Sequence, residues 1–152
     1  MTITCTVKPR KHKPVEKVFV DTAAWLALLN KDDGLHAHAR QVMQALRQRH
    51  ASLVTTEFVL LEVADALSAP IQRGHTVKFI NGLRQLRLLS IVPASQNLWA
   101  ESWQLYSNRL DKDWSLTDCS CFVVMAREGI SQAFTSDHNF EQAGYVKLMS
   151  PT

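Results

Sequence analysis

The chain has 152 residues, a length that suits one domain with a buried core and is short for two independent ones. Its composition, 46% hydrophobic and 20% charged residues, is that of a globular protein and excludes a low-complexity or disordered chain. The longest uncharged stretch, Leu88 to Ala100, is too short to span a bilayer and contains Pro93, so no transmembrane helix is expected.

Charge and cysteine content point to a cytoplasmic protein whose excess of basic residues lies at the start of the chain. Residues 1–17 contain five Lys and Arg side chains and one Glu, a net charge of +4, so the remainder sums to −1. We therefore expect residues 1–17 to be a flexible basic extension and residues 18–150 to form a single domain. The apolar run 18–29 contains Asp21 and has no signal-peptide cleavage site, so secretion is not expected. The three cysteines form no CxxC motif, which argues against a disulfide framework and a zinc ribbon.

The pattern of apolar residues predicts strands that alternate with helices. β-branched and aromatic runs identify the strands, and apolar residues at helical spacing identify the helices. The predicted elements are a strand at 16–20, helices at 23–29 and 35–50, a strand at 52–55, a helix from Thr55 or Thr56 to about Ser68, a helix at 76–86, a strand at 88–92, helices at 95–110 and 115–128, a strand at 133–136, a short helix at 139–142 and a last strand at 145–149. This order predicts an α/β sandwich in which helices flank a central, mostly parallel sheet.

Four acidic residues stand in otherwise apolar segments and mark a candidate site. Asp21 and Asp137 each follow a predicted strand, whereas Glu62 and Asp118 lie on predicted helices. Burying an ionised carboxylate is costly unless it is paired, hydrogen-bonded or bound to a metal, and few basic residues lie near these four in the sequence. Carboxylate oxygens favour Mg²⁺ or Mn²⁺, so the pattern predicts a divalent-metal site for phosphodiester hydrolysis.

Each acid also has a purely structural interpretation. Asp21 could cap the helix that follows it, Glu62 could be a partly exposed helix residue, and Asp137 could stabilise a turn. Asp118 lies three residues after Ser115, which is the spacing of a capping box and requires no metal. The metal interpretation is favoured because four separate structural roles would otherwise have to coincide.

The four acidic segments, in chain order, are VFVDTAAWLALLNKDD, TTEFVLLEVADAL, SLTDCSCFVVMAREGI and AFTSDHNFEQAGY. Together they resemble the four acidic motifs of the PIN-domain ribonucleases, especially the VapC-type toxins. The similarity runs from about Val18 to Met149 and leaves out the first seventeen residues. Each motif alone is weak, whereas the ordered set, with apolar context around every acid, is specific.

The resemblance implies a PIN-like three-layer sandwich and a metal-dependent endoribonuclease that cuts single-stranded regions of RNA. The positions that match the family's catalytic, metal-binding acids are Asp21, Glu62, Asp118 and Asp137. Thr22 and Ser136 match positions where the family often has a small hydroxyl residue that supports the metal shell. The implied cofactor is Mg²⁺ or Mn²⁺, and attack by water would leave a 5′-phosphate and a 3′-hydroxyl.

The resemblance also implies partners. A VapC-type toxin is expected to form a homodimer and to bind a VapB-type antitoxin, whose C-terminal segment brings an arginine to the acidic site. The apolar helix faces from Trp25 to Leu46 and around Phe58 are candidates for such contacts, although apolar stripes usually serve a domain's own core. Trp25 and Trp103 are expected in the core, and Trp114 on the surface, where it could stack on RNA.

Two rival functions fit the same residues. A PIN nuclease of RNA maturation or quality control would use the same four acids, but the small size and the lack of a second domain favour the toxin. A catalytically silent PIN-like binding module would use the acids only as helix caps, and the retention of all four argues against it.

Overall fold

A computed structural model describes residues 13–150, so the first twelve residues of the expected basic extension lie outside the described part. Five short strands form one central sheet, and helices separate the strands along the chain. The elements are β1 (Lys17–Val20), α1 (Thr22–Leu29), α2 (His36–Gln48), β2 (Ser52–Thr56), α3 (Glu57–Ala66), α4 (Pro70–Arg84), β3 (Leu89–Val92), α5 (Gln96–Asn108), α6 (Leu116–Glu128), β4 (Gln132–Phe134), α7 (His138–Gln142) and β5 (Val146–Lys147).

The sheet has the strand order β3-β2-β1-β4-β5, and all neighbouring strands are parallel. The chain moves outward from β1 through β2 to β3 and then returns to the other side of β1 to form β4 and β5. The direction of winding therefore reverses between β1 and β4, where Val18 pairs with Gln132 and Val20 pairs with Phe134. In open parallel sheets, ligands bind beyond the carboxyl ends of the strands at such a switch point.

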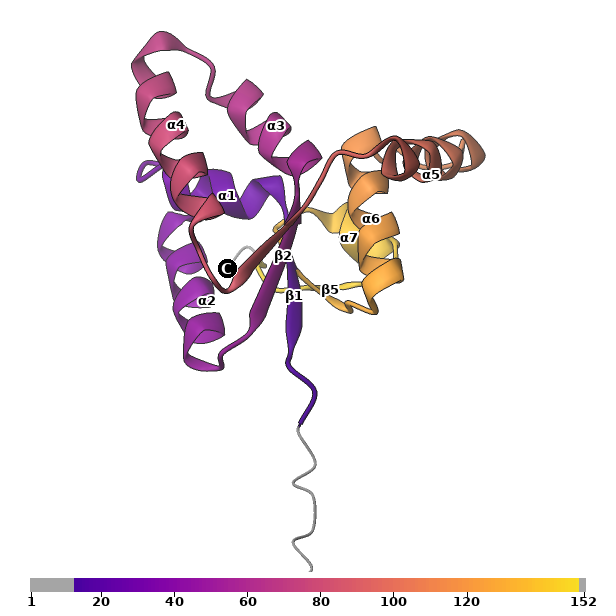
Figure 1. Ribbon diagram of the computed structural model, residues 1–152, viewed down its shortest axis with the longest axis horizontal. Helices are drawn as coiled ribbons and strands as arrows, with labels where there is room; N and C mark the ends of the chain where they lie inside the picture. The colour runs from indigo at the N-terminus through magenta and orange to yellow at the C-terminus, as the bar shows by residue number, and fades with distance from the viewer. Residues whose placement is uncertain (1–12, 151–152) are drawn as a thin grey trace, which may run out of the picture.

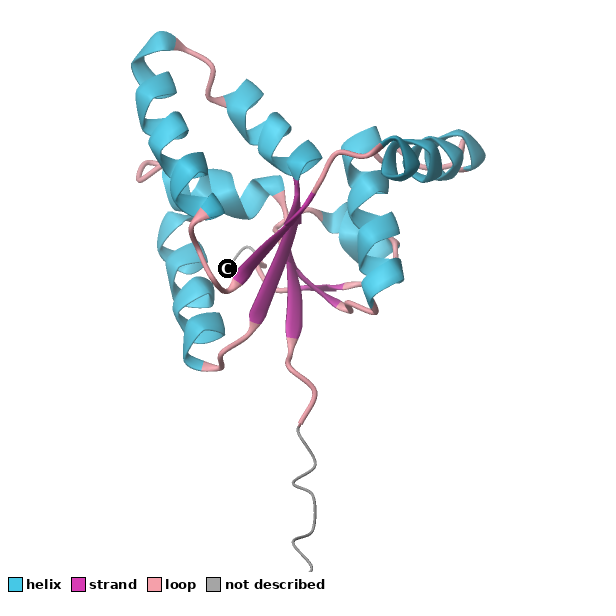
Figure 2. Ribbon diagram, in the orientation of Figure 1, coloured by secondary structure: helices cyan, strands magenta, loops and turns pink. Residues whose placement is uncertain are grey.

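Helices cover both faces of the sheet, as Figures 1 and 2 show. Helices α1 to α4 lie on one side, and α5, α6 and α7 lie on the other (Figure 1). Between these layers Val18, Phe19 and Val20 of β1 are fully buried, and the ring of Phe19 lies 6.5 Å from that of Phe140 on α7. This arrangement is the predicted three-layer α/β sandwich, with a sheet that is parallel throughout.

Short polar side chains begin several of the helices. Thr56 and Ser95 each accept a hydrogen bond from a backbone N–H in the first turn of α3 and of α5. Ser115 and Asp118 form a reciprocal capping box at the start of α6, with hydrogen bonds of 2.9 and 3.0 Å. At the other end of α6, Gly129 adopts a φ of 65°, in the left-handed region that favours glycine. Local sequence thus sets the boundaries of α3 and α6, which carry Glu62 and Asp118, and of the neighbouring α5.

Helix α4 begins earlier than the sequence pattern predicts. The expected helix covers residues 76–86, whereas the observed one runs from Pro70 to Arg84. Proline is tolerated in the first helical turn because the N–H that it lacks would have no partner there. Pro70 therefore begins the helix instead of preceding it as part of a loop.

Two of the three tryptophan predictions are wrong. Trp25 is buried as predicted, but Trp103 is 51% exposed because α5 turns a different face towards α6. Trp114 is 6% exposed, although it was expected on the surface. Its ring packs edge-on against Phe122 at 4.9 Å, and its indole N–H donates to Gln142 Oε1 at 3.1 Å. Both partners lie on other elements, Phe122 on α6 and Gln142 on α7.

The apolar faces of the first two helices serve the domain's own core. Trp25 and Leu46, which bound the stretch considered for a partner, are each 1% exposed, and Phe58 is half-buried. Within residues 13–150, no helix has the length and apolar character needed to cross a membrane.

Candidate active site

The four predicted acids meet at the carboxyl ends of the strands, beside the switch point. Asp21 directly follows β1, and its N–H donates to the carbonyl of Phe134 at 3.1 Å, which extends the contact between β1 and β4. Asp137 follows β4 and precedes α7, while Glu62 approaches from α3 and Asp118 from the first turn of α6. The fold thus brings acids from four separate segments to one edge of the sheet.

Asp21 is the most buried of the four acids. Its carboxylate Oδ2 accepts a hydrogen bond of 2.9 Å from the Thr135 hydroxyl. Burial raises the pKa of Asp21 to about 7, and the negative charges of Asp118 and Glu62 act in the same direction. Hydrogen bonds from the Thr22 N–H and the Thr135 hydroxyl favour the charged form but do not offset the burial. Asp21 therefore changes charge near neutral pH in the absence of a cation.

Asp118 is also buried and is held from two sides. Its Oδ2 accepts hydrogen bonds from the Ser115 N–H at 3.0 Å and from Asn139 Nδ2 at 3.1 Å. Burial raises the pKa of Asp118, and the nearby charge of Asp137 raises it further. The hydrogen bonds act in the opposite direction and fix the orientation of the carboxylate.

Glu62 stands at the more open side of the cluster. Partial desolvation raises its pKa, and the neighbouring Thr117 side chain opposes this rise. The charges of Asp118, Asp137 and Asp65 all raise the pKa of Glu62. Asp65, one turn further along α3, is exposed, as expected for a solvated surface acid.

Three of the four structural interpretations hold and one does not. Glu62 is an exposed residue of α3, as its structural interpretation predicts. Asp118 forms the capping box of α6, and Asp137 Oδ1 accepts the Asn139 N–H at 2.9 Å at the start of α7. Asp21 occupies the N-cap position of α1, but its side chain makes no capping hydrogen bond. Oδ2 of Asp118 accepts the capping hydrogen bond of α6, and Oδ1 of Asp137 accepts that of α7. The other carboxylate oxygen of each residue takes no part in capping. Capping and cation binding are therefore compatible.

Thr135 and Asn139 are site residues that the sequence reasoning missed. The Thr135 hydroxyl donates to Asp21 and accepts from the Asp137 N–H at 3.0 Å. Asn139 donates its side-chain N–H to Asp118 and its backbone N–H to Asp137. The signal was present in the spacing, since both residues lie two positions from Asp137, where side chains commonly bond to a neighbouring backbone N–H.

The two predicted supporting hydroxyls have different positions. Thr22 is buried beside Asp21, and its Oγ1 has no hydrogen-bond partner among the described residues. Ser136 is half-buried, and the hydroxyl that contacts Asp21 belongs to its neighbour Thr135.

The side chains of the acidic cluster are of the kind that binds a divalent cation. Within residues 13–150, no three His, Cys, Asp or Glu side chains are already arranged as a metal site. The chemistry of the residues nevertheless fits a hard cation, because the cluster consists of oxygen donors whose charges repel one another. Two buried oxygens next to the acids, Thr22 Oγ1 and Asn139 Oδ1, also lack a hydrogen-bond partner in the described part of the chain.

The parallel sheet and the acids at its switch point are features of one family of proteins. Comparison of the chain with known protein families identifies this family. A model of the PIN domain matches residues 18–145, and the chain therefore belongs to the PIN domain family. The chain is 26% identical over 132 residues to the protein named 23S rRNA-specific endonuclease VapC20 of Mycobacterium tuberculosis. That match covers 86% of this chain and 97% of the relative.

Solved structures show the same fold. The crystal structure of Mycobacterium tuberculosis VapC20, described as a sarcin-ricin loop cleaving toxin, matches with a TM-score of 0.75 and 25% identity, covering 88% of this chain and 99% of that one. VapBC2 from Rickettsia felis, bound to a DNA fragment from its promoter, matches with a TM-score of 0.64 and 13% identity over 86% of this chain and 96% of that chain. FitAcB from Neisseria gonorrhoeae matches with a TM-score of 0.61 and 14% identity, covering 86% of this chain and 95% of that chain. The last two similarities concern the fold alone.

Proposed function

We propose that this protein is a Mg²⁺- or Mn²⁺-dependent endoribonuclease and the toxin of a type II toxin–antitoxin pair. The observation that carries this proposal is the convergence of Asp21, Glu62, Asp118 and Asp137 at the carboxyl edge of the sheet. The similarity to a relative named as an rRNA endonuclease, over nearly all of that relative's length, supports it.

The four acids would hold the ion, with the oxygens of Thr22 and Ser136 as supporting groups. When bound, Mg²⁺ or Mn²⁺ lowers the pKa of a water molecule and stabilises the charge that develops on the scissile phosphate. The hydrogen bonds from Thr135 to Asp21 and from Asn139 to Asp118 hold these carboxylates in place, so that little reorganisation is needed during the reaction.

The thiols next to the acids are poor nucleophiles. Burial, together with the negative charge of Asp118, raises the pKa of Cys119 to about 11. Burial and the neighbouring carboxylates also raise the pKa of Cys121 well above its usual range. Neither thiol is therefore expected to act as the nucleophile. The resemblance to the PIN-domain ribonucleases implies that water attacks and leaves a 5′-phosphate and a 3′-hydroxyl.

Purified protein incubated with mixed RNA tests the nuclease proposal. We expect cleavage with Mg²⁺ or Mn²⁺, none with EDTA, and none with Asp21→Asn, which keeps the shape of the side chain and removes its charge. Asp32→Asn, at an exposed acid in the turn after α1, is the matched control and should cut like the parent. Cleavage that persists in EDTA or in Asp21→Asn would contradict the proposal.

The toxin role has a separate test. Induced expression of the parent chain should arrest growth, and Asp21→Asn should not. Co-expression of a VapB-type antitoxin, whose arginine would pair with the acids, should restore growth. Cleavage without growth arrest would favour a nuclease of RNA maturation, whereas a folded protein that cuts no RNA would favour a silent binding module. Sedimentation measures the proposed homodimer.

We also propose that this is a cytoplasmic protein whose single domain begins at β1. The domain boundary then lies before Glu16 and not after Lys17, because Lys17 pairs with Ser52 in the sheet and the Glu16 carbonyl accepts the Ser52 N–H. Limited digestion with trypsin should leave a stable fragment that begins shortly before β1. Rapid digestion within residues 18–150 would contradict this division.

A further inference from the structure

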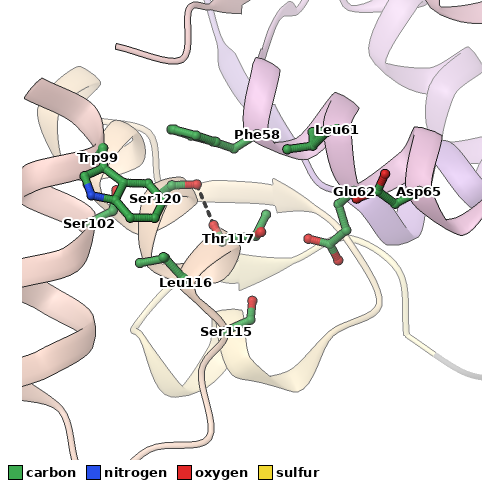
Figure 3. A pocket seen from close by; sticks show the side chains of 10 residues that line it. All are labelled: Phe58, Leu61, Glu62, Asp65, Trp99, Ser102, Ser115, Leu116, Thr117 and Ser120. Carbon is green, nitrogen blue, oxygen red and sulfur yellow. Dashed lines mark hydrogen bonds between the residues drawn. The ribbon is translucent and has the colours of Figure 1, made fainter. Parts of the chain in front are cut away.

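Negative charge dominates the edge of the sheet where the four acids lie. The cavity beside them is lined by Glu62 and Asp65 and, among the described residues, by no Lys, Arg or His (Figure 3). Carboxylates of this kind repel the phosphate groups of RNA. A nuclease built around these acids therefore needs positive charge on another part of its surface to retain its substrate.

Basic side chains are concentrated in the helical layer formed by α1 to α4. Helices α2 and α4 contain no Asp or Glu, whereas α5, α6 and α7 in the opposite layer each contain at least one (Figure 1). On α2, Arg40 and Arg47 are exposed and form no ion pair with any residue of the described part of the chain. The positive charge of α2 is therefore available to a partner.

A groove of about 830 Å³ lies along α2 where this helix meets the end of α1. Its lining includes Lys31, His36, Arg40 and Arg47 and, within residues 13–150, no Asp or Glu. We call this surface the basic groove. His36 Nδ1 donates a hydrogen bond of 2.7 Å to the Ala27 carbonyl, which holds the start of α2 against α1 and fixes the walls of the basic groove.

The spacing of the charges favours an extended anion. Arg40 and Arg47 are separated by about two helical turns, which places them roughly 10 Å apart along α2. One small anion cannot bridge this separation, whereas phosphates along a nucleic-acid strand can reach both guanidinium groups. Gln41 and Gln44, which also line the basic groove, carry side-chain amides that can donate to phosphate and ribose oxygens.

An apolar partner fits this surface poorly. No large hydrophobic side chain of α1 or α2 is exposed to solvent. Leu28 and Met43, the large apolar residues of the lining, are half-buried because they pack against the domain's own core. A membrane or an amphipathic helix would therefore gain little apolar contact here, and charge complementarity selects a polyanion.

We propose that the basic groove binds the sugar-phosphate backbone of RNA and holds the strand while the four acids act on it. This inference rests on the proposed ribonuclease function and adds a binding surface away from the acids. Helix α1 connects the two places, because it begins directly after Asp21 and its residue Leu28, about 10 Å further along the helix axis, lines the basic groove. One RNA molecule can therefore contact both.

Binding of a fluorescently labelled RNA hairpin, measured by anisotropy over a range of KCl concentrations, tests the proposal. All variants are made in the full chain carrying Asp21→Asn, so that the RNA survives. The double change Arg40→Gln and Arg47→Gln should weaken binding on the order of tenfold and reduce the slope of log affinity against log salt concentration by about 1.5–2. Arg40→Lys with Arg47→Lys keeps both charges and should retain most of the affinity.

Arg127→Gln is the matched control, because it removes an exposed arginine from α6 in the opposite layer. We expect this variant to bind the hairpin with the affinity and the salt dependence of its parent. An equal loss of affinity in Arg127→Gln and in the double Gln variant would overturn the proposal, because the effect would then be one of net charge alone.

Two further results would overturn the assignment of the basic groove. The first is an unchanged affinity and an unchanged salt slope in the folded double Gln variant. The second is a loss of binding to labelled poly-L-glutamate in that variant while its RNA affinity stays at the parental value. That outcome would assign the basic groove to an acidic protein partner.

Cleavage kinetics separate this inference from the proposed function. In the chain that keeps Asp21, the double Gln change should raise KM and leave kcat unchanged, because the basic groove does not contact the scissile phosphate. If the parent cuts RNA and the double Gln variant keeps its KM, the nuclease proposal stands and the basic groove fails. If the parent cuts no RNA but the double Gln variant loses RNA binding, the nuclease proposal fails and the basic groove belongs to an RNA-binding module.

Discussion

Thr135 donates a hydrogen bond of 2.9 Å to Oδ2 of Asp21, although 114 positions separate the two residues. The same hydroxyl accepts the N–H of Asp137 at 3.0 Å. One buried side chain therefore joins the first and the fourth acidic segments across the switch point of the sheet. Changes at Thr135 should affect both the chemistry of the site and the stability of the fold.

Replacing Thr135 with Val keeps the shape of the side chain and removes the hydroxyl. We expect Thr135→Val to lower the free energy of unfolding by about 1–3 kcal/mol, because the Asp137 N–H loses its acceptor inside the protein. We also expect the pKa of Asp21 to rise, so that the cleavage rate reaches its plateau at a higher pH. Thr135→Ser should retain both properties. Urea denaturation and a pH profile of cleavage measure these effects, and an unchanged profile in Thr135→Val would contradict the role in positioning Asp21.

The stability of the metal-free protein should depend on pH through Asp21. Burial raises its pKa from 3.8 to about 7, so between these values the unfolded chain releases a proton that the folded chain retains. The contribution is fully present below the ordinary pKa and is lost as the pH rises towards 7. Asp21→Asn should therefore be more stable than the parent at pH 8 by about 2–4 kcal/mol, with little difference near pH 4. Urea denaturation in EDTA provides the measurement, and a difference independent of pH would count against the buried, protonated carboxyl.

Divalent metal should stabilise the folded protein. A ligand that binds only the folded state stabilises it by about 2.7 kcal/mol at a concentration 100 times its Kd. We therefore expect Mg²⁺ or Mn²⁺ to raise the Tm of the parent in a thermal scan, and to raise that of Asp21→Asn much less. KCl of the same ionic strength is the control for screening. Equal increases in the parent and in Asp21→Asn would show that the ion binds elsewhere.

Asn139 should act through the acids that it contacts. Its side chain donates to Asp118 at 3.1 Å, and Oδ1 of the same amide is buried without a partner among the described residues. Removing such a supporting contact typically costs about 10–100-fold in metal affinity. We expect Asn139→Ala to weaken Mn²⁺ binding by this factor in a calorimetric titration, whereas Asn81→Ala, at an exposed position of α4, should not. An Asn139→Ala protein that binds Mn²⁺ like the parent would refute the supporting role.

The end of α6 offers a test of the fold alone. Gly129 has a φ of 65°, and a Cβ added there would meet no atom within 4 Å. The cost of Gly129→Ala is therefore conformational, roughly 1 kcal/mol in the free energy of unfolding. Denaturant unfolding should show this loss with the cleavage rate unchanged, and a loss of several kcal/mol would contradict a purely conformational cost.

Periodicity in the sequence was enough to predict the layers of the fold. The strands of the sheet are short apolar runs, and their alternation with helices leaves few arrangements besides a parallel sheet covered on both faces. The acids were found in the same way, because a charge in an apolar segment is conspicuous. Element ends were less certain, as α4 shows, because proline is compatible with both a loop and the first turn of a helix.

The tertiary structure decided which face of each helix is buried. Helix α5 carries apolar residues on more than one face, and only its packing against α6 leaves Trp103 in solvent. Trp114 is buried because Phe122 and Gln142 lie beside it in space. Local spacing contains no information about such contacts, since their partners come from other elements.

The sequence by itself determined the class of fold, and it predicted the four acids as a candidate site for a hard cation. The tertiary structure decided how these acids interact, because the strand order brings Asp21 and Asp137 together and buries the first more than the second. It also decided the roles of Thr135 and Asn139, whose hydrogen bonds to Asp21 and Asp118 reach across the sheet edge. Hydrogen bonding and desolvation depend on distances in space, so they become visible only when the chain has folded.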